Sequence, residues 1–272
     1  MKKNTFFIII VFLSQLILSQ KHYPIFSWDK VPVAYHFGKK GDVLTSDEAK
    51  FIASKTNFVV LEKAHGFPKY KYSEEAIAKD AKVLKKYNED MKVVFYWNAF
   101  LDYSMYKAHE EYEANPNWWL KNADGTLDLK NDRIKRYDLS NPAVRKWWID
   151  VAEKNVDTKY IDGVFFDALV QVTSPSNQKQ WGKEKYDAIQ QALKDLIKET
   201  RERLGDDKLI VYNGIRSTPN RIMGNNFPEN TDAIMIEHFA HFNSTAKESM
   251  LLDIQEMEKA GKSGKIVVFK SW

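Results

Sequence analysis

The fold is decided by the stretch Gly163-Val164-Phe165-Phe166-Asp167, an apolar run that ends in a carboxylate. The run is continuous rather than alternating, as expected for a parallel strand covered on both faces. Segments with helical periodicity separate it from six similar runs, which are Val31 to Phe37, Phe58 to Leu61, Val93 to Trp97, Leu209 to Tyr212, Ala233 to Ile236 and Ile266 to Phe269. This alternation predicts a parallel α/β sheet with right-handed crossovers, a (β/α)₈ TIM barrel with seven strands present.

The segments between the runs carry helix signatures. Thr45 and Glu48 form a capping box. Asn141 can cap a helix that has Pro142 at its first position. The buried stripe of that helix is predicted to be Val144, Trp147, Trp148 and Val151.

Residues 1–19 have the pattern of a secretory signal peptide. Lys2 and Lys3 precede an apolar run, and Ser19 is a small residue suited to the position before a cleavage site. Removal of these 19 residues and their two lysines leaves a barrel domain over residues 20–272 with a formal charge of +2. We therefore expect a secreted or periplasmic protein, with no membrane partner after cleavage of the signal.

Composition excludes several classes of protein. The chain has no cysteine, which excludes a disulfide scaffold, an Fe–S site, a cysteine nucleophile and a lipid-modified N-terminus. A nearly neutral mature domain lacks the clustered positive charge that nucleic acids require, so we expect no nucleic-acid partner. Eight Trp, 13 Tyr and 16 Phe argue for a large packed core and against disorder.

Two carboxylates follow apolar runs directly, where the C-terminal strand ends of a barrel build the active site. Asp167 follows the fourth run, Gly163 to Phe166, and Glu237 follows the sixth. Glycoside hydrolysis needs two such groups, a nucleophile or base and a general acid, and alternate strands can face each other across the barrel. The simpler alternative is that each carboxylate caps a helix or pairs with a nearby Lys or Arg.

Other strand-end residues fit a sugar-binding site, with aromatic faces for stacking and polar groups for hydroxyls or a substituent acid. They are Tyr35, His36, Glu62, Trp97, Asn98, Asn213, Arg216, His238, Lys270 and Trp272. Each aromatic has core packing as its alternative role, Asn213-Gly214 could be only a turn, and Glu62 could simply pair with Lys63.

Residues 99–140 form the longest connection and show no clear apolar periodicity. They hold five large aromatics, Tyr103, Tyr106, Tyr112, Trp118 and Trp119. Long structured loops are often functional lids. A surface excursion packed by its own aromatics is an equally good interpretation.

The segment from Tyr160 to Ala168 resembles the TIM-barrel hydrolases of the α-galactosidase superfamily, especially families near endo-α-1,4-polygalactosaminidase. A second matching segment consists of Trp119 to Gly125, which ends in Asp124-Gly125, and of Tyr137 to Arg145, which contains Asp138-Leu139-Ser140-Asn141-Pro142. The resemblance implies that Asp167 is the catalytic carboxylate of strand four and that Glu237 is the acid/base of strand six. It does not indicate a particular glycan.

Three functions follow from these patterns. The first is a secreted glycosidase that acts on a carbohydrate substrate and needs no cofactor or metal. The second is a carbohydrate-binding barrel without catalytic activity. The third is a metal-dependent hydrolase using His36, His65, His238 and His241, although strand one lacks the pair of histidines, one residue apart, that such barrels usually need.

The last predicted strand ends at the final residues of the sequence. A barrel that lacks its eighth unit would leave two strand edges unpaired. We therefore expect the chain to be a fragment, cut before the eighth βα unit, of a longer glycosidase.

Overall fold

The computed structural model describes residues 22–27, 29, 31–218, 221–224, 229–241 and 245–271. The predicted signal peptide and Trp272 lie outside these residues.

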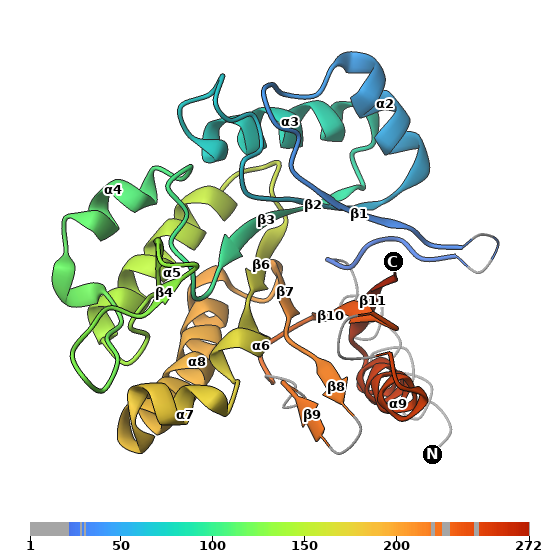
Figure 1. The fold of residues 1–272 in the computed structure, drawn as a ribbon. Coiled ribbons are helices and arrows are strands. Elements are labelled where there is room, and N and C mark those ends of the chain that lie inside the picture. The colour runs from blue at the N-terminus through green and yellow to red at the C-terminus, as the bar shows by residue number, and fades with distance from the viewer. Residues whose placement is uncertain are drawn as a thin grey trace, which may run out of the picture.

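Seven parallel strands form one nearly closed, barrel-shaped sheet with helices on its outside (Figure 1). The spatial order of the strands follows the chain: β1 (Ala34–Phe37), β2 (Phe58–Leu61), β3 (Lys92–Asn98), β6 (Gly163–Asp167), β7 (Leu209–Asn213), β10 (Ala233–Phe239) and β11 (Ile266–Ser271). All seven predicted strands are confirmed, and the fold is that of a TIM barrel with seven strands. Because β7 alone separates β6 from β10, the ends that carry Asp167 and Glu237 are two strands apart.

The first strand is shorter than its apolar run suggested. Parallel pairing with β2 begins at Ala34, opposite Phe58. Val31 and Val33 precede this pairing and are exposed. The prediction that the strand starts at Val31 was therefore wrong, because the apolar residues extend further toward the N-terminus than the segment that pairs with β2.

Helices cover the outer face of the sheet. They are α2 (Ser46–Lys55), α3 (Ser73–Tyr87), α5 (Pro142–Val156), α6 (Leu169–Val172), α7 (Ser176–Trp181), α8 (Lys183–Leu204) and α9 (Lys247–Lys262). The predicted capping box of Thr45 and Glu48 is present on α2. Asn141 accepts a hydrogen bond from the Ala143 amide at the start of α5, as predicted. In the stripe of that helix, Val144, Trp147 and Trp148 are buried, whereas Val151 is only partly buried.

Strand alternation decides which side chains enter the barrel. Successive residues of a strand point to opposite faces, so Tyr96 and Asn98 share one face of β3 and Trp97 lies on the other. Phe165 and Asp167 alternate in the same way with Phe166 on β6. Tyr96 stacks on Phe165 within the barrel, and Phe166 packs on the α5 side.

Residues 99–140 carry their own secondary structure. They contain α4 (Ala108–Glu113), the 3₁₀ helix η1 (Pro116–Trp118) and a hairpin of β4 (Leu129–Lys130) and β5 (Ile134–Lys135). Tyr106, Tyr112 and Trp118 are buried, so packing by its own aromatics is confirmed for this segment. A second hairpin, β8 (Arg216–Thr218) with β9 (Arg221–Met223), follows β7.

Candidate active site

Polar side chains from all seven strand ends converge at the C-terminal end of the barrel. We call them the strand-end cluster, which consists of His36, Glu62, Tyr96, Asn98, Asp167, Asn213, Glu237 and Lys270. The parallel sheet brings them together because all its strands end at the same edge.

Asp167 is held by three donors from neighbouring strands. The Tyr96 hydroxyl and the Asn98 amide nitrogen, at 3.2 Å, donate to Oδ2, and Asn213 Nδ2 donates to Oδ1 at 2.9 Å. The next residue, Ala168, has a left-handed backbone with φ of 71°. A non-glycine residue in this conformation is strained, and such strain is typical of functional sites.

Asn213 connects the two predicted catalytic carboxylates. Its Nδ2 lies 2.9 Å from Asp167 Oδ1 and 2.8 Å from Glu237 Oε2. A primary amide carries two N–H groups, so it can donate to both oxygens at once. Asn213 is therefore more than part of a turn, because its side chain holds both carboxylates.

Basic groups surround Glu237. His238 Nε2 lies 3.4 Å from Oε2, and Lys270 Nζ lies 3.8 Å from Oε1. Burial lowers the pKa of His238, whereas the Glu237 charge opposes this shift. The Glu237 side chain keeps 28 % of its surface exposed, so a ligand can reach it.

Glu62 lies on the other side of the cluster, where it interacts with two basic residues. Lys63 Nζ is 2.5 Å from Glu62 Oε2, and His36 Nε2 is 3.7 Å from the same oxygen. Burial lowers the pKa of His36 despite the neighbouring Glu62 charge, so its imidazole is largely neutral at pH 7. The predicted pairing of Glu62 with Lys63 is present, and it lies within the site.

Two aromatic residues predicted to bind sugar are placed elsewhere, and both predictions are corrected here. Trp97 is 1 % exposed and packs among Tyr106, Trp147 and Trp148 on the outer face of β3. Tyr35 follows the same alternation, since its neighbour His36 contacts Phe165 inside the barrel. Neither ring can stack on a ligand at the strand ends.

The other predicted binding residues lie at or next to the cluster. Asn98 is fully buried, and its oxygen accepts from the Phe100 and Leu101 amides, so it orients Asp167 and cannot reach a sugar hydroxyl. Arg216 is half-buried on β8, where burial lowers its pKa and the Glu237 charge opposes the shift. The prediction for Trp272 lies outside the described residues.

Several residues near the site were missed by sequence reasoning. Tyr96 is one residue from Trp97, and the alternation that places Asn98 inside could have identified it. Lys63 Nζ lies 4.6 Å from the centre of the Tyr96 ring and 5.8 Å from that of Tyr103. Burial, with Asp167 and Glu62 adding to it, raises the pKa of Tyr103 to about 12. Tyr103 belongs to the long connection, so sequence spacing could not place it.

The histidines of the metal-dependent alternative do not form a shared site in the described residues. His65 is buried and bonds Asp80 at 2.7 Å, on the outer side of the sheet. The one group of potential metal ligands among these residues is Asp102, His109 and Glu113, and Lys135 already binds Glu113.

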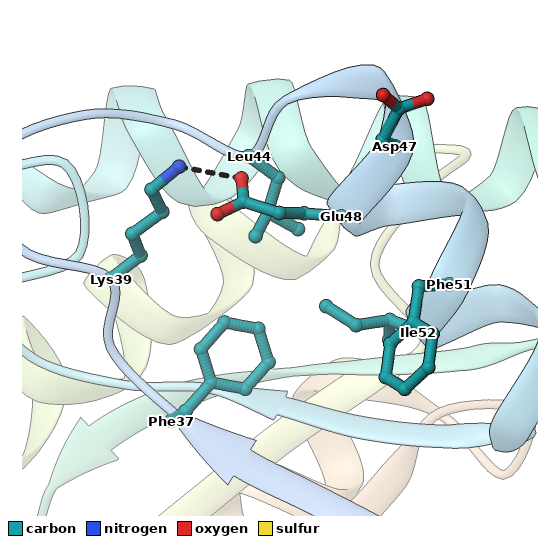
Figure 2. Close-up of a pocket in the computed structure, with 7 residues that line it drawn as sticks. All are labelled: Phe37, Lys39, Leu44, Asp47, Glu48, Phe51 and Ile52. Carbon is teal, nitrogen blue, oxygen red and sulfur yellow. Dashed lines mark hydrogen bonds and ion pairs between the residues drawn. The ribbon is translucent and has the colours of Figure 1, made fainter.

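A separate hollow lies between β1 and α2 (Figure 2). Phe37 and Ile52 line it, and Lys39 bonds Glu48 at its rim. No member of the strand-end cluster lines this hollow.

Comparison with known proteins defines the class. The cycloisomaltooligosaccharide glucanotransferase of Paenibacillus sp. aligns with 93 % of this chain and 39 % of its own at 15 % identity and a TM-score of 0.60. The maltogenic α-amylase AmyB of Thermotoga neapolitana aligns with 87 % of this chain and 57 % of its own at 11 % identity and a TM-score of 0.51. The GH36 α-galactosidase AgaA of Geobacillus stearothermophilus aligns with 68 % of this chain and 28 % of its own at 14 % identity and a TM-score of 0.49.

The likeness to the glucanotransferase and to the α-amylase concerns the fold alone, which is that of a TIM barrel. The chain belongs to the hypothetical glycosyl hydrolase family 15, whose profile matches residues 85–271. This confirms the resemblance seen in the sequence. The chain spans about two-fifths of the length of the glucanotransferase. No curated protein matches it. Among the described helices, none combines the length and apolarity needed to cross a membrane.

Proposed function

We propose that the protein is a secreted glycoside hydrolase that cleaves a poly- or oligosaccharide with Asp167 as nucleophile and Glu237 as general acid. The observation that carries this proposal is the Asn213 amide, which donates to both carboxylates. Family membership supports glycan hydrolysis as the reaction class. Export rests on the signal pattern of residues 1–19, and N-terminal sequencing of the exported protein should begin at Gln20.

The separation of the carboxylates favours retention of anomeric configuration. Asp167 Oδ1 and Glu237 Oε2 both contact one nitrogen, at 2.9 and 2.8 Å, so these two oxygens lie within about 6 Å of each other. Retaining glycosidases hold their carboxyl groups about 5 to 5.5 Å apart, and inverting enzymes hold them about 6.5 to 9.5 Å apart. We therefore infer that there is no room for a water molecule between Asp167 and the sugar.

The reaction then has two steps. Asp167 Oδ1 forms a bond to the anomeric carbon as the glycosidic bond breaks, and Glu237 gives its proton to the departing oxygen. Glu237 next takes a proton from water, whose oxygen attacks the same carbon and releases Asp167. Tyr96 and Asn98 hold Asp167 in one orientation throughout, because both donate to Oδ2.

Substitution of each carboxylate by its amide tests the assignment. We expect Asp167→Asn and Glu237→Gln each to lower the rate of reducing-end release by a factor on the order of 10³. The matched controls are Asp187→Asn and Glu202→Gln on the exposed face of α8, which should keep full activity. Full activity in either site variant contradicts the role of that residue.

The stereochemical outcome is tested separately. Proton NMR of the first product formed should show the anomer of the substrate, before mutarotation mixes the two forms. The opposite anomer contradicts the nucleophile role of Asp167. Tight glycan binding without any product indicates the non-catalytic carbohydrate-binding barrel instead.

A further inference from the structure

Positive charges crowd around the carboxylates of the strand-end cluster. Lys63 pairs with Glu62 at 2.5 Å on one side, and Lys270 lies 3.8 Å from Glu237 on the other. Arg216 is half-buried within the field of Glu237. Each of these three cations therefore lies near a carboxylate of the strand-end cluster, either Glu62 or Glu237.

A fourth cation, Lys130, comes from the long connection. The β4–β5 hairpin pairs Lys130 with Ile134, and alternation places Asp128 and Arg136 on the same hairpin face. That face packs onto the barrel end, since Arg136 lies over the Phe100 ring and Asp128 bonds the Trp181 indole. The hairpin therefore directs Lys130 toward the end of the barrel where the strand-end cluster lies.

The Lys130 ammonium has no fixed anionic partner. Within the part of the chain that the structure describes, it makes no ion pair and no side-chain hydrogen bond. Burial lowers its pKa, and Asp167 and Glu237 oppose this shift from a distance. A lysine that is partly desolvated without a partner is ready to bind an external anion.

The proposed mechanism leaves the Lys130 charge without a counter-ion. Glu237 donates a proton in that mechanism, so it carries no charge when substrate binds. Lys63 is already paired with Glu62, and the Asp253 carboxylate acts on Arg216 together with Glu237. Lys130 makes no ion pair among the described residues, so an acidic group of the substrate would neutralise its charge, whereas a neutral sugar would not.

We propose that the substrate is an acidic glycan, whose carboxylate or sulfate group binds at Lys130 beside the strand-end cluster. This inference rests on the proposed function. Carboxylate and sulfate share the chemistry that a lysine recognises, which is a compact anionic group of oxygen atoms. Lys130 is thus a residue that determines specificity, delivered by the hairpin of the long connection.

Binding to charged polymers and their neutral counterparts tests this proposal without turnover. The Glu237→Gln variant serves as the parent protein, because glutamine reproduces the uncharged state of a protonated Glu237. The probes are polygalacturonate with its carboxyl-reduced form, and dextran sulfate with dextran, which separate a carboxylate from a sulfate source. We expect one acidic polymer to bind at least about tenfold more tightly than its neutral counterpart.

A second substitution assigns that preference to Lys130. Adding Lys130→Gln should weaken binding of the acidic polymer about tenfold and leave the neutral polymer unchanged. Adding Lys121→Gln, an exposed lysine of the same connection, should change neither. Equal thermal unfolding temperatures will show that both variants are folded.

The outcomes separate this proposal from the hydrolase assignment. Selective binding without cleavage by the wild-type protein supports the acidic ligand and contradicts hydrolysis. Cleavage or binding that does not distinguish charged from neutral polymers overturns the acidic-glycan proposal. No binding of either charged polymer, or equal binding by the Lys130→Gln variant, also overturns it.

Discussion

At the scale of residues, one amide side chain sets the relation between the two carboxylates. Asn213 is the last residue of β7, the strand that pairs with both β6 and β10, and its Nδ2 donates to Asp167 and Glu237. No other residue type offers two N–H donors on so short a side chain. The spacing of the proposed acid and nucleophile thus depends on this position.

We predict that Asn213→Asp moves the pH profile of kcat/KM to higher pH. A carboxylate between Asp167 and Glu237 adds a like charge, which raises the pKa of both neighbours. The acidic and the basic side of the bell-shaped pH profile therefore both move to higher pH. Initial rates between pH 4 and 9 measure the shift. Asn155→Asp on α5 is the control, and an unmoved profile in Asn213→Asp contradicts the bridging role.

Another residue, Asp102, links stability to pH. It is 6 % exposed, bonds His109 at 2.6 Å and leaves Oδ1 without a partner. Burial raises its pKa to about 6, although His109 opposes the shift. Between about pH 4 and 6 the folded state therefore binds more protons than the unfolded chain, and the contribution of Asp102 to stability falls as pH rises.

We predict that the free energy of unfolding of the Asp102→Asn variant increases relative to that of the wild type as pH rises from 4 to 7. The difference in unfolding free energy should change by up to about 3 kcal/mol in favour of the variant. Urea unfolding at each pH measures this difference. The control is Asp206→Asn at an exposed turn, and parallel curves for wild type and Asp102→Asn contradict the prediction.

At the scale of elements, a buried carboxylate fixes the β4–β5 hairpin on the barrel. Asp128 accepts hydrogen bonds from Arg136 at 3.0 Å, Gln180 at 3.1 Å and Trp181 at 2.7 Å. The hairpin carries Lys130, so this network also holds the proposed specificity residue. Of the two roles considered from its sequence, the long connection shows the packing by its own aromatics, and its role as a functional lid stays a prediction.

We predict that Asp128→Asn loosens the hairpin while the barrel stays folded. The substitution leaves the Arg136 charge uncompensated, and breaking a buried ion pair typically costs about 3 to 5 kcal/mol. Hydrogen exchange at the Leu120, Asp128 and Tyr137 amides should accelerate, because their bonds tie the connection together. The control is Asp124→Asn in the same segment, which should leave the exchange rates unchanged. Unchanged exchange rates in Asp128→Asn would contradict the role of the Asp128 network.

At the scale of the whole molecule, the sheet depends on close approach between β6 and β7. A Cβ on Gly163 would lie 2.1 Å from the carbonyl oxygen of Leu209. Gly163 therefore permits the pairing that brings Asp167 beside Asn213. Gly261 differs, since a Cβ there meets nothing within 4 Å inside α9.

We predict opposite effects for the two Gly→Ala substitutions. Gly163→Ala should destabilise the protein by at least about 3 kcal/mol, because backbone atoms must move apart. Gly261→Ala should stabilise it by up to about 1 kcal/mol through helix propensity. Thermal and urea unfolding of both variants measure this, and equal stabilities contradict the close packing of β6 against β7.

Much of this architecture could be predicted from local patterns. The seven apolar runs, the Thr45–Glu48 capping box and the Asn141–Pro142 helix start depend on a few neighbouring residues, and each is present. The strand-end positions of Asp167 and Glu237 followed from the same runs. Tyr35 and Trp97 were assigned to the site by residue type, but strand alternation turns both rings away from it.

Local periodicity was enough to predict the strands, their order along the chain and the carboxylates at their ends. The packing of distant segments places Asn213 between Asp167 and Glu237 and Lys63 over the Tyr96 ring, and it brings Lys130 into the field of both carboxylates. These interactions link residues 24 to more than 100 positions apart in the sequence. Their distances depend on barrel curvature and on how the long connection packs, and sequence spacing encodes neither.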